Sequence, residues 1–598
     1  MKRQGVYILS LDAKDIYLSN HYIQHDPVGY NIRYPNGDRN LKKFINSLDY
    51  SLDLIKLEEI YERVYRRHDF SFEQKGKQYT QRVINVTFKY SDKEFNRVRQ
   101  GLYLKSGYRY EDIELEDSAC VLNGELIAIQ TGVPVESPLS SEILGSCFSF
   151  KDGVYKAHTN IGTLHTVKEL RETLYRDGFY CDGIHYVRFK RSSGSSRVGK
   201  CLFIDEKMYK PMHRWEMCGI HFKKEQKIDL AALESYIALS SSSIIDTMEI
   251  YPHNILIIDD FESCFEDRVI AVRETKDGWL DANPETVSIS NSIWDGQSLM
   301  DTSLFGEYNK YGFLLLRNRF FKSACFNCNI QQFFADNGIT DVSQLNGFTL
   351  AQNIEDIKLI TTSSSIKYCK FGTIQTWLDR LDPMFGIVKH EKPPHFFDGR
   401  MVQAHYQLIN TLQMNEQEVQ EFIQPTLDYI ALLKSDPDIV RYHIKYPVHA
   451  EPKAASLLSK NDIVYKLLGV NNRFCNTKLY AGFLRDLVKA YVKNARCGHI
   501  LVRGAYCTMM GNGLEMLQAS VKKFDGESVI PQGCIHSKLF DYEKTILGSR
   551  SPHVCNGNVW LIKNVANKDI DRYFNLTPEI VYVNSIGDNI LQRLNGAD

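Results

Sequence analysis

Phe313-Leu-Leu-Leu-Arg317-Asn-Arg319-Phe-Phe-Lys322 decides the fold, because a short apolar run leads directly into three cations. Four consecutive apolar residues bounded by polar ones are typical of a buried strand. The cations lie just beyond the C-terminal end of the strand, where Lys322 or Arg319 could bind a triphosphate. Polar residues at strand ends are common, so the stretch alone is more simply explained as an ordinary strand end.

Short β-branched strands surround this stretch from Tyr251 to about Phe371. The clearest are residues 255–258, 268–272, 313–316 and 357–360. Loops such as residues 274–295 separate them, which predicts a closed barrel rather than a meander. The last strand runs into a hydroxyl-rich turn and then Lys367 and Lys370, for which a functional and a structural explanation are equally good.

Helices follow this barrel-like region, and strands then return. Asn415-Glu-Gln-Glu418 predicts a capping box that opens one helix, and Asn476 or Thr477 opens another that continues through Val492. The second helix has an apolar face and a basic one, the latter formed by Lys478, Arg485, Lys489 and Lys493. From residue 499 the predicted strands are 500–502, 559–562 and 580–583.

The first 240 residues predict a mixed α/β region. Residues 41–66 have the apolar spacing of a long helix, and Val121-Leu-Asn-Gly-Glu-Leu126 predicts a hairpin because Asn-Gly accepts positive φ. Residues 184–204 contain no acidic residue between five cations, Arg188, Lys190, Arg191, Arg197 and Lys200, which suits a nucleic-acid backbone. Taken alone, this segment is more simply explained as a solvated hairpin with basic flanks.

Composition and size set broader limits. At 598 residues the chain exceeds the roughly 250–300 residues of a single core, so several domains are expected. A net charge of -1 requires any phosphate-binding surface to be local. No run approaches the roughly 18 apolar residues of a spanning helix, and the first 15 residues lack a signal-peptide core, so we expect a cytoplasmic protein without membrane contact. Cys325 and Cys328 are a single Cys-x-x-Cys pair without a second pair at the spacing of a zinc site, which predicts a buried strand rather than a zinc knuckle.

These segments, in this order, resemble the two-barrel RNA polymerases, above all single-chain polymerases of phages and the eukaryotic RNA-silencing polymerases. The resemblance rests on Asp295-Gly296, on Arg317 with Lys322, on Ser365-Ile-Lys367, on Arg550-Ser-Pro-His553 and on Asn595-Gly-Ala-Asp598. It implies an α+β fold with two double-psi β-barrels. The implied regions are an N-terminal α/β region (1–240), a first barrel (241–375), a helical connector (376–495) and the start of a second barrel (496–598).

The resemblance also implies roles for individual residues. Lys322 and Lys367 would neutralise the triphosphate, and Arg317 and Arg550 would bind the nucleotide. Asp598 would be the first of three Mg²⁺ ligands in an RNA polymerase that uses a template, makes nascent RNA and consumes ribonucleoside triphosphates. A DNA template is preferred over an RNA template.

Several residues depart from the pattern of that family. The two glycines expected near Lys322 are absent, the spacing before Lys367 is one residue short so that Lys370 is an alternative, and the second and third aspartates are missing. We therefore expect a fragment with an incomplete second barrel, in which strands such as 559–562 lack partners and polymerase activity is lost. The alternatives are a non-catalytic nucleic-acid-binding fragment and another nucleotidyl or phosphoryl transferase, although the chain has no Walker-type glycine-rich loop.

Overall fold

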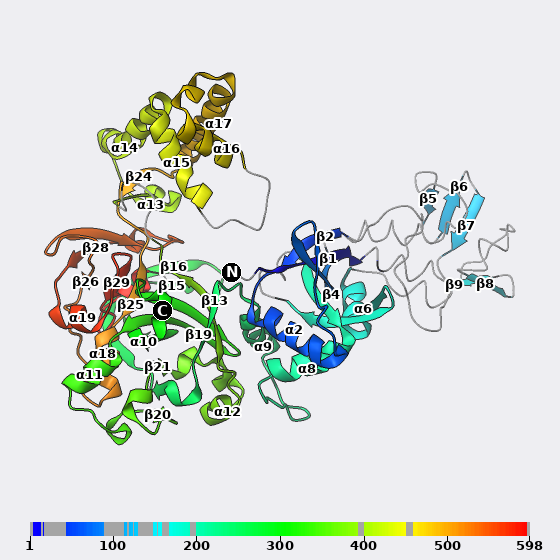
Figure 1. The fold of residues 1–598 in the computed structure, drawn as a ribbon, viewed down its shortest axis with the longest axis horizontal. Helices are drawn as coiled ribbons and strands as arrows, with labels where there is room; N and C mark the ends of the chain where they lie inside the picture. Colours follow the sequence, from blue (N-terminus) through cyan, green and yellow to red (C-terminus); the bar gives the residue numbers. More distant parts are fainter. Residues whose placement is uncertain are drawn as a thin grey trace. The chain divides into compact units, whose positions relative to one another are not determined.

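The computed structural model describes residues 4–13, 16, 43–88, 113–116, 119–122, 125–129, 148–151, 154–157, 167–191, 199–392, 397, 400–449 and 459–594. The chain divides into two compact units, Met1–Ser243 and Ile244–Asp598. Figure 1 shows both units, coloured along the sequence. Each unit is described by itself below.

The first unit is built on a seven-stranded sheet with the order β10-β11-β12-β4-β1-β2, in which β3 also pairs with β4. Its strands are β1 (Val6–Asp12), β2 (Lys43–Leu48), β3 (Phe72–Gln74), β4 (Lys77–Thr87), β10 (Phe179–Cys181), β11 (Ile184–Lys190) and β12 (Lys200–Asp205). Its helices include α2 (Leu52–Tyr65), α6 (Val167–Asp177), α8 (Glu206–Glu216) and α9 (Leu230–Ile237). Apolar residues of the central strands form its core, among them Leu9, Ile84 and Phe203.

The long helix predicted for residues 41–66 is wrong in its first third. Residues 43–48 form β2, which pairs with β1, and the helix α2 begins only after Ser51. The Ser51 side chain accepts a hydrogen bond from the Leu54 amide at 3.2 Å, which fixes the helix start. Pairing with a distant strand overrode the local helical pattern here.

The hairpin predicted around residues 121–126 is confirmed by strand pairing. β6 (Ala119–Leu122) and β7 (Glu125–Ile129) are antiparallel, with Leu122 opposite Glu125. Asn123 and Gly124, which the prediction placed in the turn, lie outside the described residues.

The second unit begins with an eight-stranded sheet of order β13-β22-β18-β19-β17-β21-β14-β20. The strands are β13 (Asp246–Glu249), β14 (Ile255–Ile258), β17 (Gln297–Asp301), β18 (Phe313–Asn318), β19 (Phe321–Cys328), β20 (Phe348–Thr349), β21 (Leu359–Thr362) and β22 (Met384–His390). β17 is parallel to β19, and β14 is parallel to β21. The strands predicted at 255–258, 313–316 and 357–360 are confirmed, the last with a shift of two residues. Barrel closure stays a prediction.

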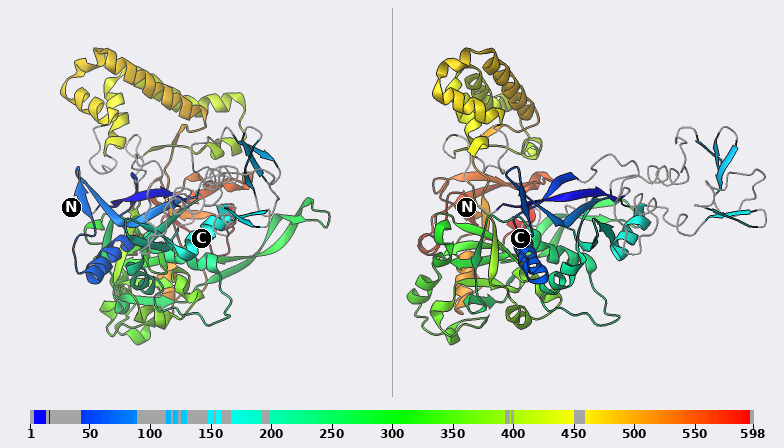
Figure 2. Two further views of the ribbon diagram at one scale, coloured as in Figure 1. Left: turned by 90° about the vertical axis from the view of Figure 1, so that its right-hand side faces the viewer. Right: turned by 45° about the vertical axis from the view of Figure 1, so that its right-hand side comes forward.

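The loop predicted for residues 274–295 is wrong. β15 (Glu262–Glu274) and β16 (Leu280–Ser292) form a long antiparallel ribbon, visible in the left view of Figure 2 as two extended strands. Most of its residues are at least partly exposed, so polar side chains on both faces masked the alternation that marks a strand.

Five helices follow the first sheet: α13 (Tyr406–Thr411), α14 (Glu416–Ser435), α15 (Pro437–His449), α16 (Lys460–Val470) and α17 (Lys478–Arg496). The predicted capping box is confirmed, because Asn415 and Glu418 exchange hydrogen bonds of 2.8 and 3.0 Å. Thr477 caps α17 as predicted, and the helix continues to Arg496. In the described parts of the chain, none of the helices has the length and apolar character that crossing a membrane requires.

The last part of the second unit is a five-stranded sheet of order β25-β29-β26-β28-β27. The strands are β25 (Thr508–Gly511), β26 (Cys534–His536), β27 (Thr545–Ser549), β28 (Val559–Asn564) and β29 (Ile580–Val583). The expectation that residues 559–562 lack partners is wrong, because β28 pairs with both β26 and β27. Both sheets of this unit contribute to one core, which includes Leu299, Phe326, Met510 and Tyr582.

Candidate phosphate-binding site

Three cations and one carboxylate meet at one end of the first sheet of the second unit. Arg317 on β18 lies opposite Lys322 on β19 in the antiparallel register. Lys367 begins the short 3₁₀ helix Lys367–Lys370, whose first amide donates to the Phe320 carbonyl at 2.7 Å. The Lys367 ammonium is 3.7 Å from the Asp295 carboxylate. We call Asp295, Arg317, Lys322 and Lys367 the cation cluster.

Positive charge in the cation cluster exceeds negative charge. Burial lowers the pKa of Lys322, and the neighbouring charges of Arg317 and Lys367 lower it further. Burial also lowers the pKa of Arg317, to about 10. Both shifts mean that the charged form is poorly stabilised within the protein, so an anion bound here would relieve the repulsion.

The structure places the alternative cations of the sequence in different surroundings. Lys367 faces Asp295, whereas Lys370 is exposed at the other end of the same 3₁₀ helix. Arg319 is buried and donates to the Arg380 carbonyl, and Arg317 is also buried and donates to the Leu316 carbonyl at 2.9 Å. Lys322 and Lys367 are therefore the more exposed cations that could contact a triphosphate.

Phe320 lies in the turn before Lys322 and has an unusual backbone conformation. Its φ is 55°, a left-handed conformation that bulky residues rarely adopt, and its side chain is fully buried. The backbone therefore keeps a geometry that favours glycine, and aromatic packing against Tyr368 and Phe371 helps to hold it.

A buried network of hydroxyl groups lies behind the cation cluster. Ser298 is 2.7 Å from both Ser323 and Thr361, and Ser365 donates to Ser323 at 3.1 Å. These bonds tie β17, β19 and β21 to the turn before Lys367. The hydroxyls of Ser298, Ser323 and Ser365 therefore position the strands that carry the cations.

A small cavity of about 80 Å³ connects Asp295 with the second sheet of the same unit. Gln297 joins the two sheets, because its side-chain amide donates to the Gly511 carbonyl at 2.7 Å and its oxygen accepts from the Gly511 amide at 2.9 Å. The Trp294 indole donates to the Asn512 carbonyl at 3.0 Å. Gln297 was not predicted as a site residue, although a polar side chain within a buried strand is a signal that the sequence contains.

Glu515 is a fully buried carboxylate close to the residues that join the two sheets, and its side-chain oxygens accept several hydrogen bonds. It accepts from Asn512, from Ser528 and from the Val529 amide at 2.8–3.0 Å, and from the Tyr582 hydroxyl. Burial and the Glu515 charge raise the pKa of Tyr582 well above its usual value. Glu515 therefore has a structural role.

The predicted Mg²⁺ site is not tested by the residues that the structure describes. Asp598 lies outside them, and within them no three His, Cys, Asp or Glu side chains are placed to hold a metal. Mg²⁺ prefers several oxygen ligands, whereas the cation cluster offers one carboxylate beside three cations. The cluster fits phosphate, and Mg²⁺ stays a prediction. Arg550, after β27, donates to the Leu594 carbonyl at 2.8 Å.

The basic segment of the first unit differs from its prediction. Lys190 is only 5% exposed and pairs with Asp53 at 2.7 Å and with Glu216, so its assignment to a phosphate-binding surface is corrected. Arg188 and Arg191 both pair with Glu234. Lys200 is half-buried and donates to Asn46 at 3.4 Å, and Arg197 lies outside the described residues.

Cys325 and Cys328 confirm the prediction of a buried strand. Both lie in β19 and are fully buried, and burial raises the pKa of both thiols, that of Cys325 to about 12. The thiolate that a zinc site requires is therefore disfavoured at both positions.

No family model and no curated protein matches this sequence. Among solved structures, the RNA-dependent RNA polymerase QDE-1 from Thielavia terrestris is similar, at 12% identity and a TM-score of 0.48. The alignment covers 100% of this chain and 53% of that polymerase, so the chain spans about half its length.

Proposed function

We propose that the chain is a template-dependent RNA polymerase whose cation cluster binds the triphosphate of the incoming ribonucleotide. The observation that carries this proposal is the convergence of Arg317, Lys322 and Lys367 from three separate segments around Asp295. Asp295 itself also lines the small cavity that the second sheet helps to form. The order of motifs in the sequence supports it independently, because the resemblance to two-barrel polymerases implies cations at these positions.

Each residue of the cation cluster has a distinct proposed role. Lys322 and Lys367 neutralise the phosphates and the negative charge that develops as the phosphorus is attacked, since preorganised cations stabilise developing charge most effectively. Arg317 adds charge from the neighbouring strand. Asp295 orients Lys367 through their ion pair while the nucleotide is absent. No step assigned here depends on Mg²⁺.

Two further parts of the proposal rest on the resemblance. Arg550 contacts the ribose of the nucleotide, which requires it to exchange its bond with the Leu594 carbonyl for a ligand contact. The template is DNA rather than RNA, as in the single-chain phage polymerases that the segments resemble.

The test combines two measurements on the full chain. The first is binding of a ribonucleoside triphosphate, and the second is incorporation of labelled ribonucleotides on matched DNA and RNA templates. Lys322→Ala and Lys367→Ala should each weaken triphosphate binding, and should lower incorporation in an extended, active version of the chain. Lys370→Ala, an exposed lysine of the same 3₁₀ helix, is the matched control.

The outcomes separate the alternatives. Triphosphate binding that depends on both lysines, without incorporation on any template, favours the non-catalytic fragment. Equal effects of Lys370→Ala and Lys367→Ala contradict the choice of Lys367 over Lys370 as the phosphate-binding lysine. Higher incorporation on RNA than on DNA overturns the template assignment alone.

A further inference from the structure

A groove runs along helix α17, and it shares no residue with the cation cluster. It has a volume of about 730 Å³ and is lined by residues of α14 and α17. Its floor consists of Ala481, Leu484, Val488 and Val492. Because these residues recur every three or four positions, they form one aliphatic strip along the helix. At 1.5 Å per residue the groove follows roughly 22 Å of α17.

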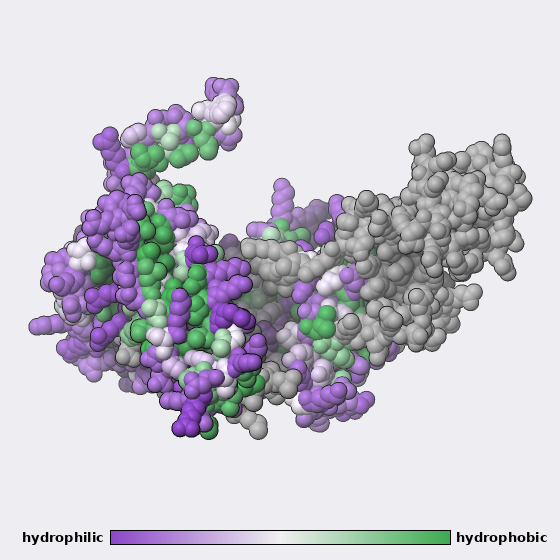
Figure 3. All heavy atoms as spheres, turned by 90° about the horizontal axis from the view of Figure 1, so that it is seen from above, coloured by the Kyte–Doolittle hydropathy of each residue, from purple (hydrophilic) through white to green (hydrophobic). Residues whose placement is uncertain are grey.

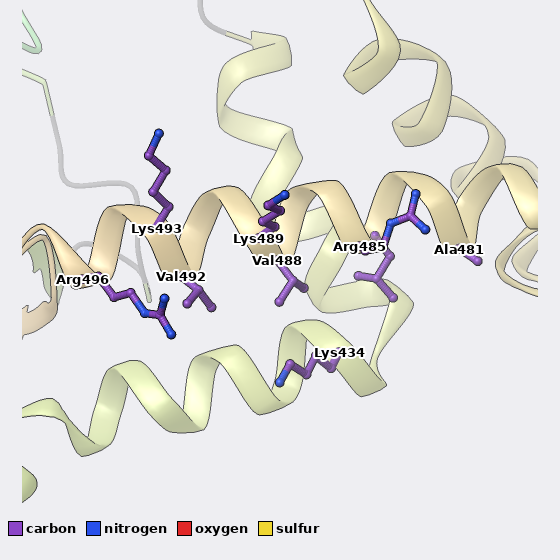
Figure 4. Close-up of a pocket in the computed structure, with 9 residues that line it drawn as sticks. Lys434, Ala481, Arg485, Val488, Lys489, Val492, Lys493 and Arg496 are labelled. Atoms are coloured by element: carbon purple, nitrogen blue, oxygen red, sulfur yellow. The ribbon is translucent and has the colours of Figure 1, made fainter.

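Cations border this strip on both sides. Figure 4 shows Arg485, Lys489 and Lys493 along one edge, and Arg496 with Lys434 of α14 along the other. All five side chains are exposed. Seen from above, where these helices are nearest the viewer, the surface shows a band of hydrophobic side chains bordered by hydrophilic ones (Figure 3).

The positive charge of the groove is largely uncompensated. None of the residues that line it is acidic. Within the described parts of the chain, the ion pair that these cations form is that of Arg485 with Asp486, at 3.9 Å. Like charges four residues apart disfavour a helix, and Arg485, Lys489 and Lys493 have this spacing. The arrangement therefore costs stability unless a negative partner covers it.

We propose that this groove binds an acidic amphipathic helix of a protein partner. An aliphatic strip flanked by charge is the surface that helix-in-groove recognition uses, with apolar residues of the incoming helix on the strip and its charges against the edges. Here the charge complement is a helix with Leu or Ile on one face and Glu or Asp on both flanks. About four turns of such a helix match the length of the groove.

Single-stranded nucleic acid fits the groove less well. Proteins that bind it without sequence preference stack bases on aromatic side chains, and the residues that line this groove include none. The aliphatic floor therefore favours a peptide helix, although the cations alone suit either ligand.

The test uses a defined probe, a fluorescein-labelled helical peptide of about 16 residues with Leu at its a and d positions and Glu at its e and g positions. Its binding to the full chain is measured by fluorescence anisotropy. The double variant Lys489→Glu and Lys493→Glu should weaken binding roughly tenfold or more, because like charges then face each other. The matched control is Lys460→Glu with Lys478→Glu, which changes two exposed lysines of α16 and α17 outside the groove.

A charge-swapped probe with Lys at the e and g positions should bind the reversed variant better than the unchanged chain, an outcome that general misfolding does not produce. Val488→Ser should weaken binding of the acidic peptide and leave binding of an oligoribonucleotide probe unchanged.

Three outcomes would overturn the proposal: no binding of the acidic peptide, equal losses in the control variant, or groove-dependent binding of the oligoribonucleotide in place of the peptide. Because the peptide probe and the groove variants involve no residue of the cation cluster, failure of this experiment leaves the proposed polymerase function untouched.

Discussion

Two basic regions of this chain look alike in sequence and differ in structure. Residues 184–204 of the first unit and the cation cluster of the second unit both place several cations close together. In the first, Asp53, Glu216 and Glu234 neutralise Lys190, Arg188 and Arg191. In the second, one carboxylate, Asp295, faces three cations, of which it contacts Lys367.

The difference shows what a run of cations means once the chain is folded. A charge that carboxylates from elsewhere in the chain already satisfy contributes to stability and has little left for a ligand. A charge that burial and neighbouring cations destabilise is available for an anion. The density of cations along the sequence does not show which cations are paired, because the carboxylates that pair with them are distant in the sequence.

The largest expected effect is on stability, from removal of the buried cation of the first region. Lys190→Met leaves Asp53 and Glu216 buried without their cation, which should lower the free energy of unfolding by about 3–5 kcal/mol. Thermal unfolding of the full chain, with hydrogen exchange of β11 and α8, measures the loss.

Lys210→Ala is the matched control, because Lys210 is exposed on α8 of the same unit. Its effect should stay within about 0.5 kcal/mol. A Lys190→Met variant as stable as this control would contradict the structural role of Lys190.

The same buried group predicts a dependence of stability on pH. Burial raises the pKa of Glu216 from 4.5 to about 7, although the charge of Lys190 opposes the shift. The folded chain therefore binds more protons than the unfolded chain between these values. Stability should fall as pH rises through this window, by on the order of 1–3 kcal/mol.

Glu216→Gln should flatten this dependence, because the amide does not titrate. Denaturant unfolding from pH 4.5 to 8, compared between the variant and the unchanged chain, provides the measurement. A slope that survives the substitution would assign the pH dependence to another group.

A smaller effect is expected in the second region. Asp295→Asn removes the only carboxylate of the cation cluster, which should tighten binding of inorganic triphosphate by roughly two- to fivefold, the size of a partly exposed ion pair. Calorimetric titration measures it. Weaker binding would mean that Asp295 positions Lys367 more than it competes with the anion.

The smallest effect is expected from the paired arginines of the first region. Arg188→Ser with Arg191→Ser should change the affinity for single-stranded nucleic acid less than about twofold at moderate salt, since Glu234 already pairs with both side chains. A large loss across all sequences would restore this segment as a phosphate-binding surface.

Local signals in the sequence predicted many elements correctly. The apolar run 255–258 and the capping box at Asn415 required only neighbouring residues, so β14 and the start of α14 appeared where expected. Residues 268–272 were predicted as a strand and lie in β15, but the rest of β15 and all of β16 were missed because both faces of the ribbon carry polar side chains. Residues 43–48 became a strand because a distant strand, β1, pairs with them.

The candidate site was predicted in part. Lys322 and Lys367 were identified from the sequence, and the structure brings them together with Arg317. The pairing of Lys367 with Asp295 and the bridge made by Gln297 depend on the packing of several strands, which local patterns do not encode. For the same reason the burial of Lys190 was not foreseen.

The most direct test is calorimetric titration of a ribonucleoside triphosphate into the full chain. The unchanged chain is compared with Lys322→Ala plus Lys367→Ala and with Arg188→Ser plus Arg191→Ser. We predict that replacing both lysines weakens binding at least tenfold, which corresponds to about 1.4 kcal/mol, and that replacing both arginines has no measurable effect. Equal affinities in all three proteins would contradict the account.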